Sequence, residues 1–128
     1  MANMKHVFVS FAGEDKFARD TLVNQAKQEG SNLFDFTDMS VKDPLDAKWR
    51  TMCRERIKGC DGAIVFISRY TPEAQDVCWE IRCAREEGIS IRGFWVHKDE
   101  PCGKPIELGG TPVVNWNWDT VSSFIHSL

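Results

Sequence analysis

The sequence lacks the features that mark nucleic-acid-binding, membrane-spanning and secreted proteins. Its 128 residues carry a net charge of −3 and the isoelectric point is about 5.6, with no cluster of lysine and arginine that would attract a nucleic acid. No apolar run approaches the ~20 residues that a membrane-spanning helix needs. No secretory signal precedes the strand-like start KHVFVSF at residues 5–11. We therefore expect a cytoplasmic protein that has neither a nucleic-acid nor a membrane partner.

Disulfide, metal-binding and phosphate-loop patterns are also missing. The chain has five cysteines, an odd number, and no C-x-x-C pair. Without a secretory signal this usage predicts reduced thiols. No spacing of cysteine and histidine resembles a zinc ligand set, so we expect no metal site. The turn after the first predicted strand, AGED, has a single glycine, and therefore no glycine-rich nucleotide loop is expected.

What the sequence does contain is a regular alternation of strand and helix patterns. A chain of this length suits one domain, 1–128, whose core needs no disulfides. The predicted strands are 5–11, 32–36, 62–68, 89–97 and 112–116. The predicted helices are 14–30, 46–58, 72–87 and 117–128, and a turn-rich stretch covers 98–111. Alternation of this kind predicts an α/β fold, a flavodoxin-like three-layer sandwich in which a parallel sheet of order 2-1-3-4-5 has helices on both faces.

This topology also predicts where a ligand lies. In open parallel sheets the ligand site is at the carboxyl ends of the strands, where the strand order reverses, here between the first and third strands. The residues expected at this edge are Ser10, Phe11 and Ala12 after the first strand and Ser68, Arg69 and Tyr70 after the third. The helix predicted over 72–87 starts at the same edge, with Thr71 as its N-cap and Pro72 in its first turn.

Helical periodicity predicts which side chains the helices bury. The shared faces are Phe17, Ala18, Leu22 and Ala26 on the first helix, Trp49, Met52, Cys53 and Ile57 on the second, and Ala74, Val77, Cys78 and Ile81 on the third. Glu80 lies on the flank of the third face. Its carboxylate is either one more solvated helix glutamate or a group that faces a cleft, and the spacing leaves both open. Trp79 falls on the opposite, polar side, and we expect it to pack on a neighbouring loop or on a partner chain.

Several functions of this fold class are excluded by what the expected site lacks. A phosphoacceptor receiver needs clustered acids after the first strand, an aspartate ending the third and a lysine ending the fourth, whereas this chain has Ser10–Phe11, Ser68 and His97. A cysteine or serine nucleophile needs a neighbouring base. Neither His6, which starts a strand, nor His126, in the last helix, is placed to serve as one, and we expect both to have structural roles.

Four segments, in order along the chain, resemble TIR domains. VFVSFAGEDKFARDTL is similar to their opening, in which a strand ends in Ser-Phe or Ser-Tyr before an acidic turn. CDGAIVFISRYT and VCWEIRCAREEGISIRGFWV are similar to their third strand, catalytic helix and fourth strand. The ending PVVNWNWDTVSSFI most resembles the compact TIR-like branch of bacterial and archaeal proteins that includes the Thoeris antiphage sensor. The resemblance covers essentially the whole chain.

The resemblance implies an enzyme that cleaves NAD+ as its substrate, with no cofactor and no metal. Glu80 matches the helix glutamate that faces the ribose next to nicotinamide in active TIR enzymes. The nucleotide would lie over the ends of the first and third strands and under the loop after the second strand. The residues expected to contact it are Ser10, Phe11, Ala12, Asp38, Ser68 and Trp79. Trp49 is expected either in the core or as a wall of the pocket.

One position departs from the family pattern. Many TIR enzymes carry a tryptophan four residues before the catalytic glutamate, and this chain has Asp76 there. Trp79 replaces that ring only if the start of the helix is irregular. The departure keeps a second interpretation open, a non-catalytic TIR-like module that acts by self-association. A third is a nucleoside deoxyribosyltransferase-like enzyme, which shares the architecture and also uses a helix glutamate.

For the NAD+-cleaving interpretation, the expected setting is bacterial defence or signalling, with a cyclic ADP-ribose-type messenger as the product. The resemblance implies self-association through TIR–TIR contacts, a phage-derived trigger, and a downstream effector that reads the product. We expect weak activity from the isolated chain, rising with protein concentration.

Overall fold

The computed structural model of the chain describes residues 5–29, 34–39, 45–97 and 103–128. The strands are β1 (Lys5–Ser10), β2 (Phe34–Thr37), β3 (Gly62–Ile67), β4 (Ser90–Trp95) and β5 (Val113–Asn115). The helices are α1 (Lys16–Gln28), α2 (Ala47–Lys58), α3 (Gln75–Glu86) and α4 (Trp118–His126), and short 3₁₀ turns are η1 (Gly13–Asp15), η2 (Thr71–Glu73) and η3 (Ile106–Leu108). Parts of the predicted pattern, Gly30 as a helix end, strand residues 32–33 and turn residues 98–102, lie outside the described residues.

The sheet has the predicted order. Its strands run β2-β1-β3-β4-β5, and every neighbouring pair is parallel. β3 is buried along its whole length, as its continuous apolar sequence predicts for a strand covered on both faces. The order reverses between β1 and β3, so the carboxyl ends of these two strands form the switch point at which a ligand is expected.

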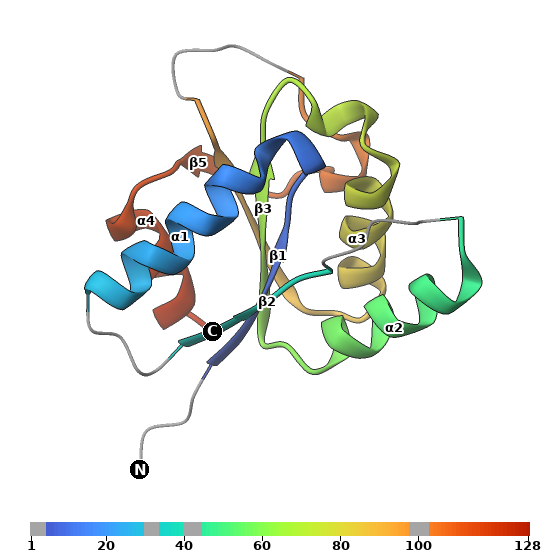
Figure 1. Ribbon diagram of the computed structural model, residues 1–128, viewed down its shortest axis with the longest axis horizontal. Coiled ribbons are helices and arrows are strands. Elements are labelled where there is room, and N and C mark those ends of the chain that lie inside the picture. Colours follow the sequence, from blue (N-terminus) through green and yellow to red (C-terminus); the bar gives the residue numbers. More distant parts are fainter. Residues whose placement is uncertain (1–4, 30–33, 40–44, 98–102) are drawn as a thin grey trace.

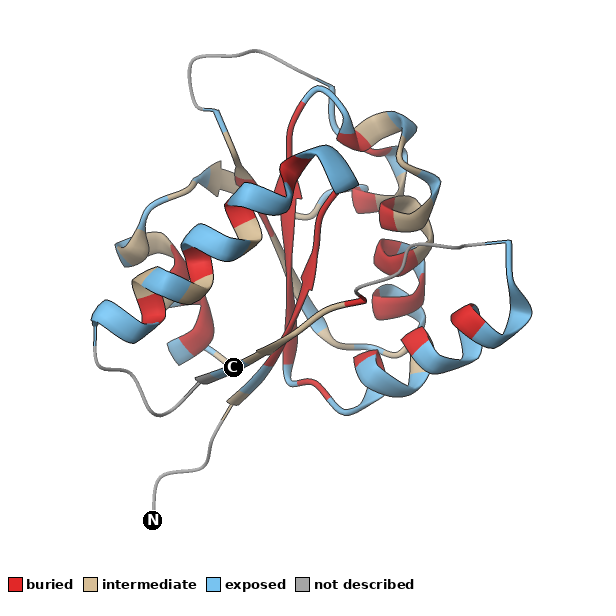
Figure 2. Ribbon diagram, in the orientation of Figure 1, coloured by how far each residue is buried: buried red, intermediate tan, exposed pale blue. Residues whose placement is uncertain are grey.

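The helices divide evenly between the two faces of the sheet. Figure 1 shows α1 and α4 on one face and α2 and α3 on the other, with the sheet between them. The buried residues of each helix face the sheet and the exposed ones face outward (Figure 2). This is the three-layer arrangement that the alternation of strands and helices predicts.

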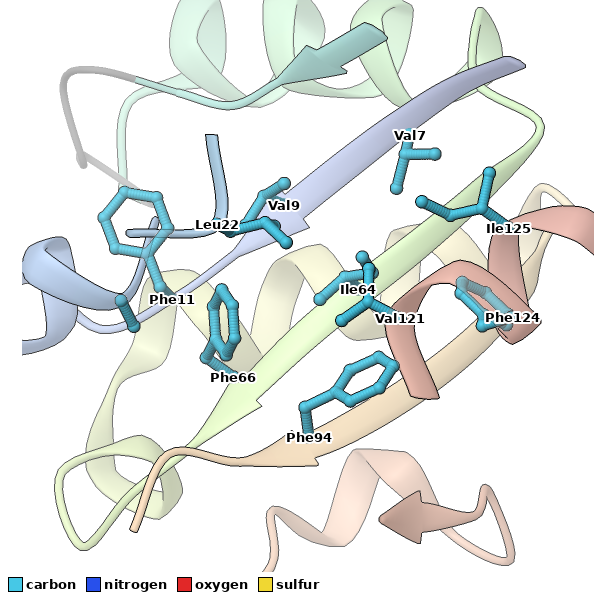
Figure 3. Packing of buried hydrophobic residues seen from close by; sticks show 11 residues of the cluster. Val7, Val9, Phe11, Leu22, Ile64, Phe66, Phe94, Val121, Phe124 and Ile125 are labelled. Carbon is cyan, nitrogen blue, oxygen red and sulfur yellow. The ribbon is translucent and has the colours of Figure 1, made fainter. Parts of the chain in front are cut away.

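The face under α1 and α4 holds the larger continuous core (Figure 3). Val7 and Val9 of β1 point to this face because successive side chains of a strand alternate. They pack with Leu22 of α1 and Phe124 of α4. The same alternation sends Phe8 and Ser10 toward α2 and α3, and Phe8 packs there with residues of both helices.

The start of the third helix differs from the prediction. Residues 72–87 do not form one helix, because η2 ends at Glu73 and Ala74 has extended backbone angles before α3 begins at Gln75. Thr71 is not an N-cap. Its hydroxyl accepts a hydrogen bond from the Ser68 N–H at 2.8 Å and lies 3.2 Å from the Phe66 carbonyl oxygen, to which it donates. The hydroxyl is thus used to close the end of β3 and is not available to α3.

Two side chains predicted for the core are exposed. Phe17 is 49% exposed and Met52 is 53% exposed. The buried face of α2 consists of Trp49, Cys53 and Ile57, spaced four residues apart, and a residue one position before Cys53 points away from this narrow face. Phe17 lies in the first turn of α1, where its ring stacks on His97 with centroids 5.9 Å apart.

Gly93 provides a test of the β4–β5 packing. A Cβ atom at this position would lie 2.8 Å from Cγ2 of Val113, the residue with which Gly93 pairs across the two strands. Because valine is stiff at χ1, we expect Gly93→Ala to displace β5 and to lower the free energy of unfolding by about 1–3 kcal/mol. Urea denaturation measures the change. Gly110→Ala is the control, since a Cβ there meets nothing within 4 Å; equal effects of the two substitutions would contradict the explanation.

Candidate functional site

Glu80, near the carboxyl edge of the sheet, is charged by type and only 1% exposed. The prediction that it lies on a partly open flank is wrong. The buried residues of α3 are Val77, Glu80, Ile81, Cys83 and Ala84, a face wide enough to meet both the sheet and α2. The periodicity of one helix does not reveal a neighbouring helix that covers its flank, which is why Glu80 was placed at the boundary.

Two side chains from distant parts of the chain contact the Glu80 carboxylate. The Ser10 hydroxyl, at the end of β1, donates a hydrogen bond to Oε1 at 2.6 Å. The Cys53 thiol, in the middle of α2, donates to Oε2 at a sulfur–oxygen distance of 3.9 Å. Ser10 is 2% exposed and Cys53 is fully buried. Hydrogen bonds to a carboxylate are stronger than neutral ones, and Ser10 therefore fixes the orientation of Oε1.

Two tryptophans, Trp49 of α2 and Trp79 of α3, pack on each other between these two helices. Trp49 is 6% exposed and belongs to the apolar cluster that also contains Phe8 and Cys53. Trp79 meets it edge to face, with ring centroids 5.5 Å apart and planes at 63°. The Arg54 guanidinium lies 5.7 Å from the centre of the Trp79 ring. Trp79 therefore packs on α2, a contact that its polar surroundings in sequence had not suggested.

A second buried polar pair joins the loops after β1 and β3. The Ser68 hydroxyl donates to Oδ2 of Asp15 at 2.5 Å, and the two residues are 3% and 1% exposed. Burial raises the pKa of Asp15 above its ordinary value, against the lowering effects of the Ser68 hydrogen bond and of His97; Glu14 adds a smaller upward effect. Asp15 was not among the predicted site residues, and the only signal in the sequence was an acid in the turn directly after a strand.

The other predicted site residues are not gathered around Glu80. The Phe11 ring packs with the α1 and α4 core on the opposite face of the sheet, 5.9 Å from the Arg19 guanidinium. Ala12 is fully buried in the cluster that also holds Val77 and Ile81. Asp38, whose side chain is 15% exposed, lies 3.6 Å from Arg19. The structure thus brings Ser10 and Glu80 together and places Ser68 in a separate pair with Asp15.

A cavity of about 360 Å³ lies on the outer side of Trp79. It is lined by Leu45, Arg50, Pro72, Glu73, Gln75, Cys78, Trp79, Arg82 and Glu107. Its volume is in the range of small-molecule sites, but Glu80 and Ser10 are not among its lining residues. Trp79 is the single predicted site residue that borders this space.

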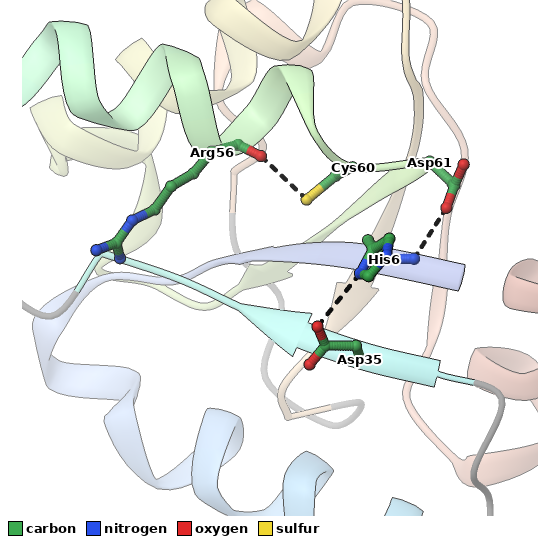
Figure 4. Close-up of polar contacts among 5 residues, drawn as sticks. All are labelled: His6, Asp35, Arg56, Cys60 and Asp61. Atoms are coloured by element: carbon green, nitrogen blue, oxygen red, sulfur yellow. Dashed lines mark hydrogen bonds and ion pairs between the residues drawn. The ribbon is translucent and has the colours of Figure 1, made fainter. Parts of the chain in front are cut away.

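The described histidines and cysteines are engaged in structural contacts. Figure 4 shows His6 at the amino end of β1, where its ring lies 3.2 Å from Asp35 and its backbone N–H donates to Asp61 at 2.9 Å.

The described cysteines form no disulfide. Burial raises the pKa of Cys60, Cys78 and Cys83 to about 11, so these thiols are protonated at neutral pH and are poor nucleophiles. Within the described part of the chain no three His, Cys, Asp or Glu side chains gather as a metal site would require, and no helix there is long and apolar enough to cross a membrane.

The Asp15–Ser68 pair predicts a pH dependence of stability. A carboxyl whose pKa is raised on folding favours the folded state at low pH, and this contribution is lost as the pH rises from about 4 through the raised pKa. The free energy of unfolding of wild type should therefore fall relative to Asp15→Asn as the pH rises from 4 to 7, by about 1.4 kcal/mol for each unit by which the pKa is raised. Urea denaturation at a series of pH values measures this difference.

The Ser68 hydroxyl lowers the pKa of Asp15, so Ser68→Ala should steepen the pH dependence in wild type. In the Asp15→Asn background the same substitution should leave the slope unchanged. A constant difference between wild type and Asp15→Asn over this pH range would contradict the assignment.

Solved structures with the same fold include proteins of several kinds. The TIR domain of the Toll-related receptor TRR-2 from Hydra magnipapillata matches with a TM-score of 0.63 at 16% identity, over 94% of this chain and 91% of that chain. A 3-dehydroquinate dehydratase-like protein from Bifidobacterium longum matches at 0.58 and 8% identity, over 97% and 94%. A prokaryotic SEFIR domain matches at 0.54 and 11%, over 96% and 88%. At such low identity these likenesses establish the fold alone.

The family comparison is more specific. No curated protein sequence gives a significant match. The sequence model of the family described as Thoeris protein ThsB, TIR-like domain, matches residues 8–101. That range covers most of the chain and includes Ser10, Cys53 and Glu80. The chain belongs to the Thoeris ThsB TIR-like family.

Proposed function

We propose that this protein cleaves the bond between nicotinamide and ribose in NAD+, with Glu80 as the catalytic residue. The observation that carries the proposal is a buried carboxylate at the switch point of the sheet, held by the Ser10 hydroxyl at 2.6 Å. A charged group in such surroundings is costly to stability, and groups of this kind concentrate at functional sites. Membership of the ThsB TIR-like family supports the choice of NAD+ as substrate.

The chemistry requires little more than one carboxylate. Nicotinamide in NAD+ is cationic, so it leaves with the electron pair of the broken bond and needs no general acid. The ribose carbon left behind develops positive charge, as in glycoside hydrolysis. The Glu80 carboxylate stabilises that charge, because a fixed anion in a site shielded from water interacts strongly with a developing cation. No metal and no cofactor take part.

The second reactant decides the product. Water attacks the ribose carbon, loses a proton and gives ADP-ribose. A ring nitrogen or a hydroxyl of the same nucleotide gives a cyclic ADP-ribose isomer, which is one water lighter than ADP-ribose. We propose the cyclic product, acting as a messenger in a cytoplasmic bacterial defence pathway with a phage-derived trigger and an effector that reads the messenger.

In this proposal the remaining predicted residues belong to the carboxyl edge of the sheet, where the nucleotide would lie. Ser10 orients the catalytic carboxylate. Phe11, Ala12 and Ser68 lie at the ends of β1 and β3, under the nucleotide, and Asp38 lies at the end of β2. Trp49 of α2 and Trp79 of α3, which meet edge to face, supply aromatic surface for a base or for nicotinamide.

A second function, a non-catalytic module that works by self-association, is favoured by two observations. Glu80 is only 1% exposed, and Asp76 stands where many TIR enzymes have tryptophan. Both observations fit an interaction module in which the Glu80 carboxylate has no catalytic role. The two functions differ in one measurable respect, which is whether NAD+ is consumed.

Glu80→Gln tests the catalytic assignment. The substitution keeps the size of the side chain and an oxygen that accepts from Ser10, but it removes the charge. We expect NAD+ turnover at high protein concentration to fall at least ~100-fold, as when a group that stabilises transition-state charge is lost. Products are separated by chromatography and identified by mass, which distinguishes ADP-ribose from the cyclic isomer.

Glu55→Gln, an exposed change on α2, is the matched control and should turn over NAD+ like wild type. Equal turnover by wild type and Glu80→Gln would remove Glu80 from the mechanism. No NAD+ loss with any variant, even after addition of extract from infected cells, would favour the scaffold. Transfer between nucleosides without NAD+ loss would point to a deoxyribosyltransferase-like enzyme.

Protein concentration tests the role of self-association. If assembly stabilises the active state, the specific activity should rise with concentration until assembly is complete, because association follows mass action. NAD+ turnover per chain is measured from nanomolar to high micromolar protein, with the assembly state followed by light scattering. A specific activity that is constant over this range would show that the isolated chain is already competent.

A further inference from the structure

The cavity on the outer side of Trp79 is a second candidate site, because Glu80 is not among its lining residues. Its volume is about 360 Å³, and its walls come from four elements, to which Arg50, Glu73, Trp79 and Glu107 belong. These elements are α2, η2, α3 and η3, and the other three all pack on α3. Figure 1 shows α2 next to α3 on one face of the sheet. A concave space of this volume, with an aromatic ring and a few charged groups in its walls, has the composition of a small-molecule site.

The charged side chains are distributed unevenly around this cavity. Arg50 comes from the first turn of α2. Among the described residues no ion pair is found for Arg50, which is exposed. The carboxylates of Glu73 and Glu107 come from η2 and η3. Arg82 of α3 lies 3.5 Å from Glu107, so its charge is partly compensated there. The α2 side of the cavity is therefore cationic, and the side formed by η2 and η3 is mainly anionic.

Two uncharged side chains of α3 also line the cavity. The Trp79 ring is held edge to face against Trp49, with centroids 5.5 Å apart, and is thus a fixed aromatic wall. Cys78 is protonated at neutral pH, because burial, with Glu107 adding to the effect, raises its pKa to about 11. Its thiol donates to the Pro72 carbonyl oxygen at 3.8 Å. The cavity therefore offers one cationic side, one aromatic wall and one side that accepts hydrogen bonds.

We propose that this cavity is a second binding site, which takes a purine mononucleotide with an exocyclic amino group. The phosphate binds the Arg50 guanidinium, whose parallel N–H donors match phosphate oxygens. The base packs against the Trp79 ring, stacked or edge to face. Its amino group donates to a carboxylate on the side formed by η2 and η3. The cavity holds one nucleotide unit, so a dinucleotide such as NAD+ binds here less tightly. The site does not rest on the proposed function.

Binding of AMP to the full chain tests the site. The affinity is measured by isothermal titration calorimetry, and the contact with the base is followed through the indole N–H resonance of Trp79 in NMR spectra. We expect saturable binding to one site in wild type and in Glu80→Gln, because Glu80 does not line the cavity. Ribose 5-phosphate, which has no base, should bind more weakly and should leave the Trp79 resonance nearly in place.

Two variants test the two main contacts. Arg50→Gln should weaken AMP binding about five-fold, as expected when an exposed charge pair is lost. Lys48→Gln is the matched control, since Lys48 is an exposed cation in the same turn of α2 that does not line the cavity, and it should leave the affinity unchanged. Trp79→Leu keeps apolar bulk but removes the aromatic ring, and it should weaken binding about two- to ten-fold. Urea denaturation checks that each variant is folded.

Four results would each overturn the proposal. They are the absence of saturable AMP binding at millimolar concentration, equal weakening by Arg50→Gln and Lys48→Gln, an affinity for ribose 5-phosphate equal to that for AMP, and an affinity for NAD+ equal to that for AMP. Loss of AMP binding in Glu80→Gln would place the nucleotide at that carboxylate and would likewise remove the second site. Because only binding is measured, a failure of NAD+ turnover would count against the proposed function and not against this site.

Discussion

A carboxylate held away from water is the constraint on which the rest of this structure depends. Burying such a group is unfavourable unless hydrogen bonds replace the lost water. For Glu80, Ser10 of β1 and Cys53 of α2 supply two of them, so the carboxylate of α3 ties two helices to the end of a central strand. An apolar side chain of similar volume would fill the same space at lower cost. The position is therefore explained better by function than by stability.

The polar contacts at the two ends of the sheet differ in kind. At the amino end, His6 meets Asp35 and Asp61 across exposed strand ends (Figure 4), where ion pairs contribute little. At the carboxyl end, both Glu80–Ser10 and Asp15–Ser68 are buried. In open parallel sheets, ligands bind at the carboxyl ends of the strands, where the loops on either side of the switch point leave a crevice. The Asp15–Ser68 pair joins the loops after β1 and β3. It thereby holds the end of β1, which carries Ser10, in place beside the end of β3.

The fold could be predicted from the sequence because its signals are local. The apolar run of β3 and the alternation of strands and helices were enough to give the strand order. Contacts between helices depend on residues far apart in the sequence, and the sequence pattern did not predict them. Glu80 was placed on a flank because its own helix does not show the neighbouring α2, and the contact of Trp79 with α2 was missed for the same reason. Phe17 and Met52 fit the apolar spacing of their helices. The buried face of each helix is narrower than that spacing suggests, and both side chains lie outside it. Thr71 had the sequence of an N-cap, yet its hydroxyl serves the end of β3.

A buried carboxylate is compatible with catalysis if substrate or assembly favours a conformation that exposes it. A ligand shifts a conformational equilibrium only by the difference between its affinities for the two states. Glu80 is 1% exposed here, so under the proposed function any contact of NAD+ with it would favour a state in which the carboxylate is exposed. Contacts between chains that favour the same state would add to the effect of substrate. The weak activity that we expect from the isolated chain would then follow from a small exposed fraction and not from a defective site. In the proposed function, Asp76 affects contacts with the substrate, because it stands where many TIR enzymes have tryptophan, and it leaves the catalytic carboxylate of Glu80 in place.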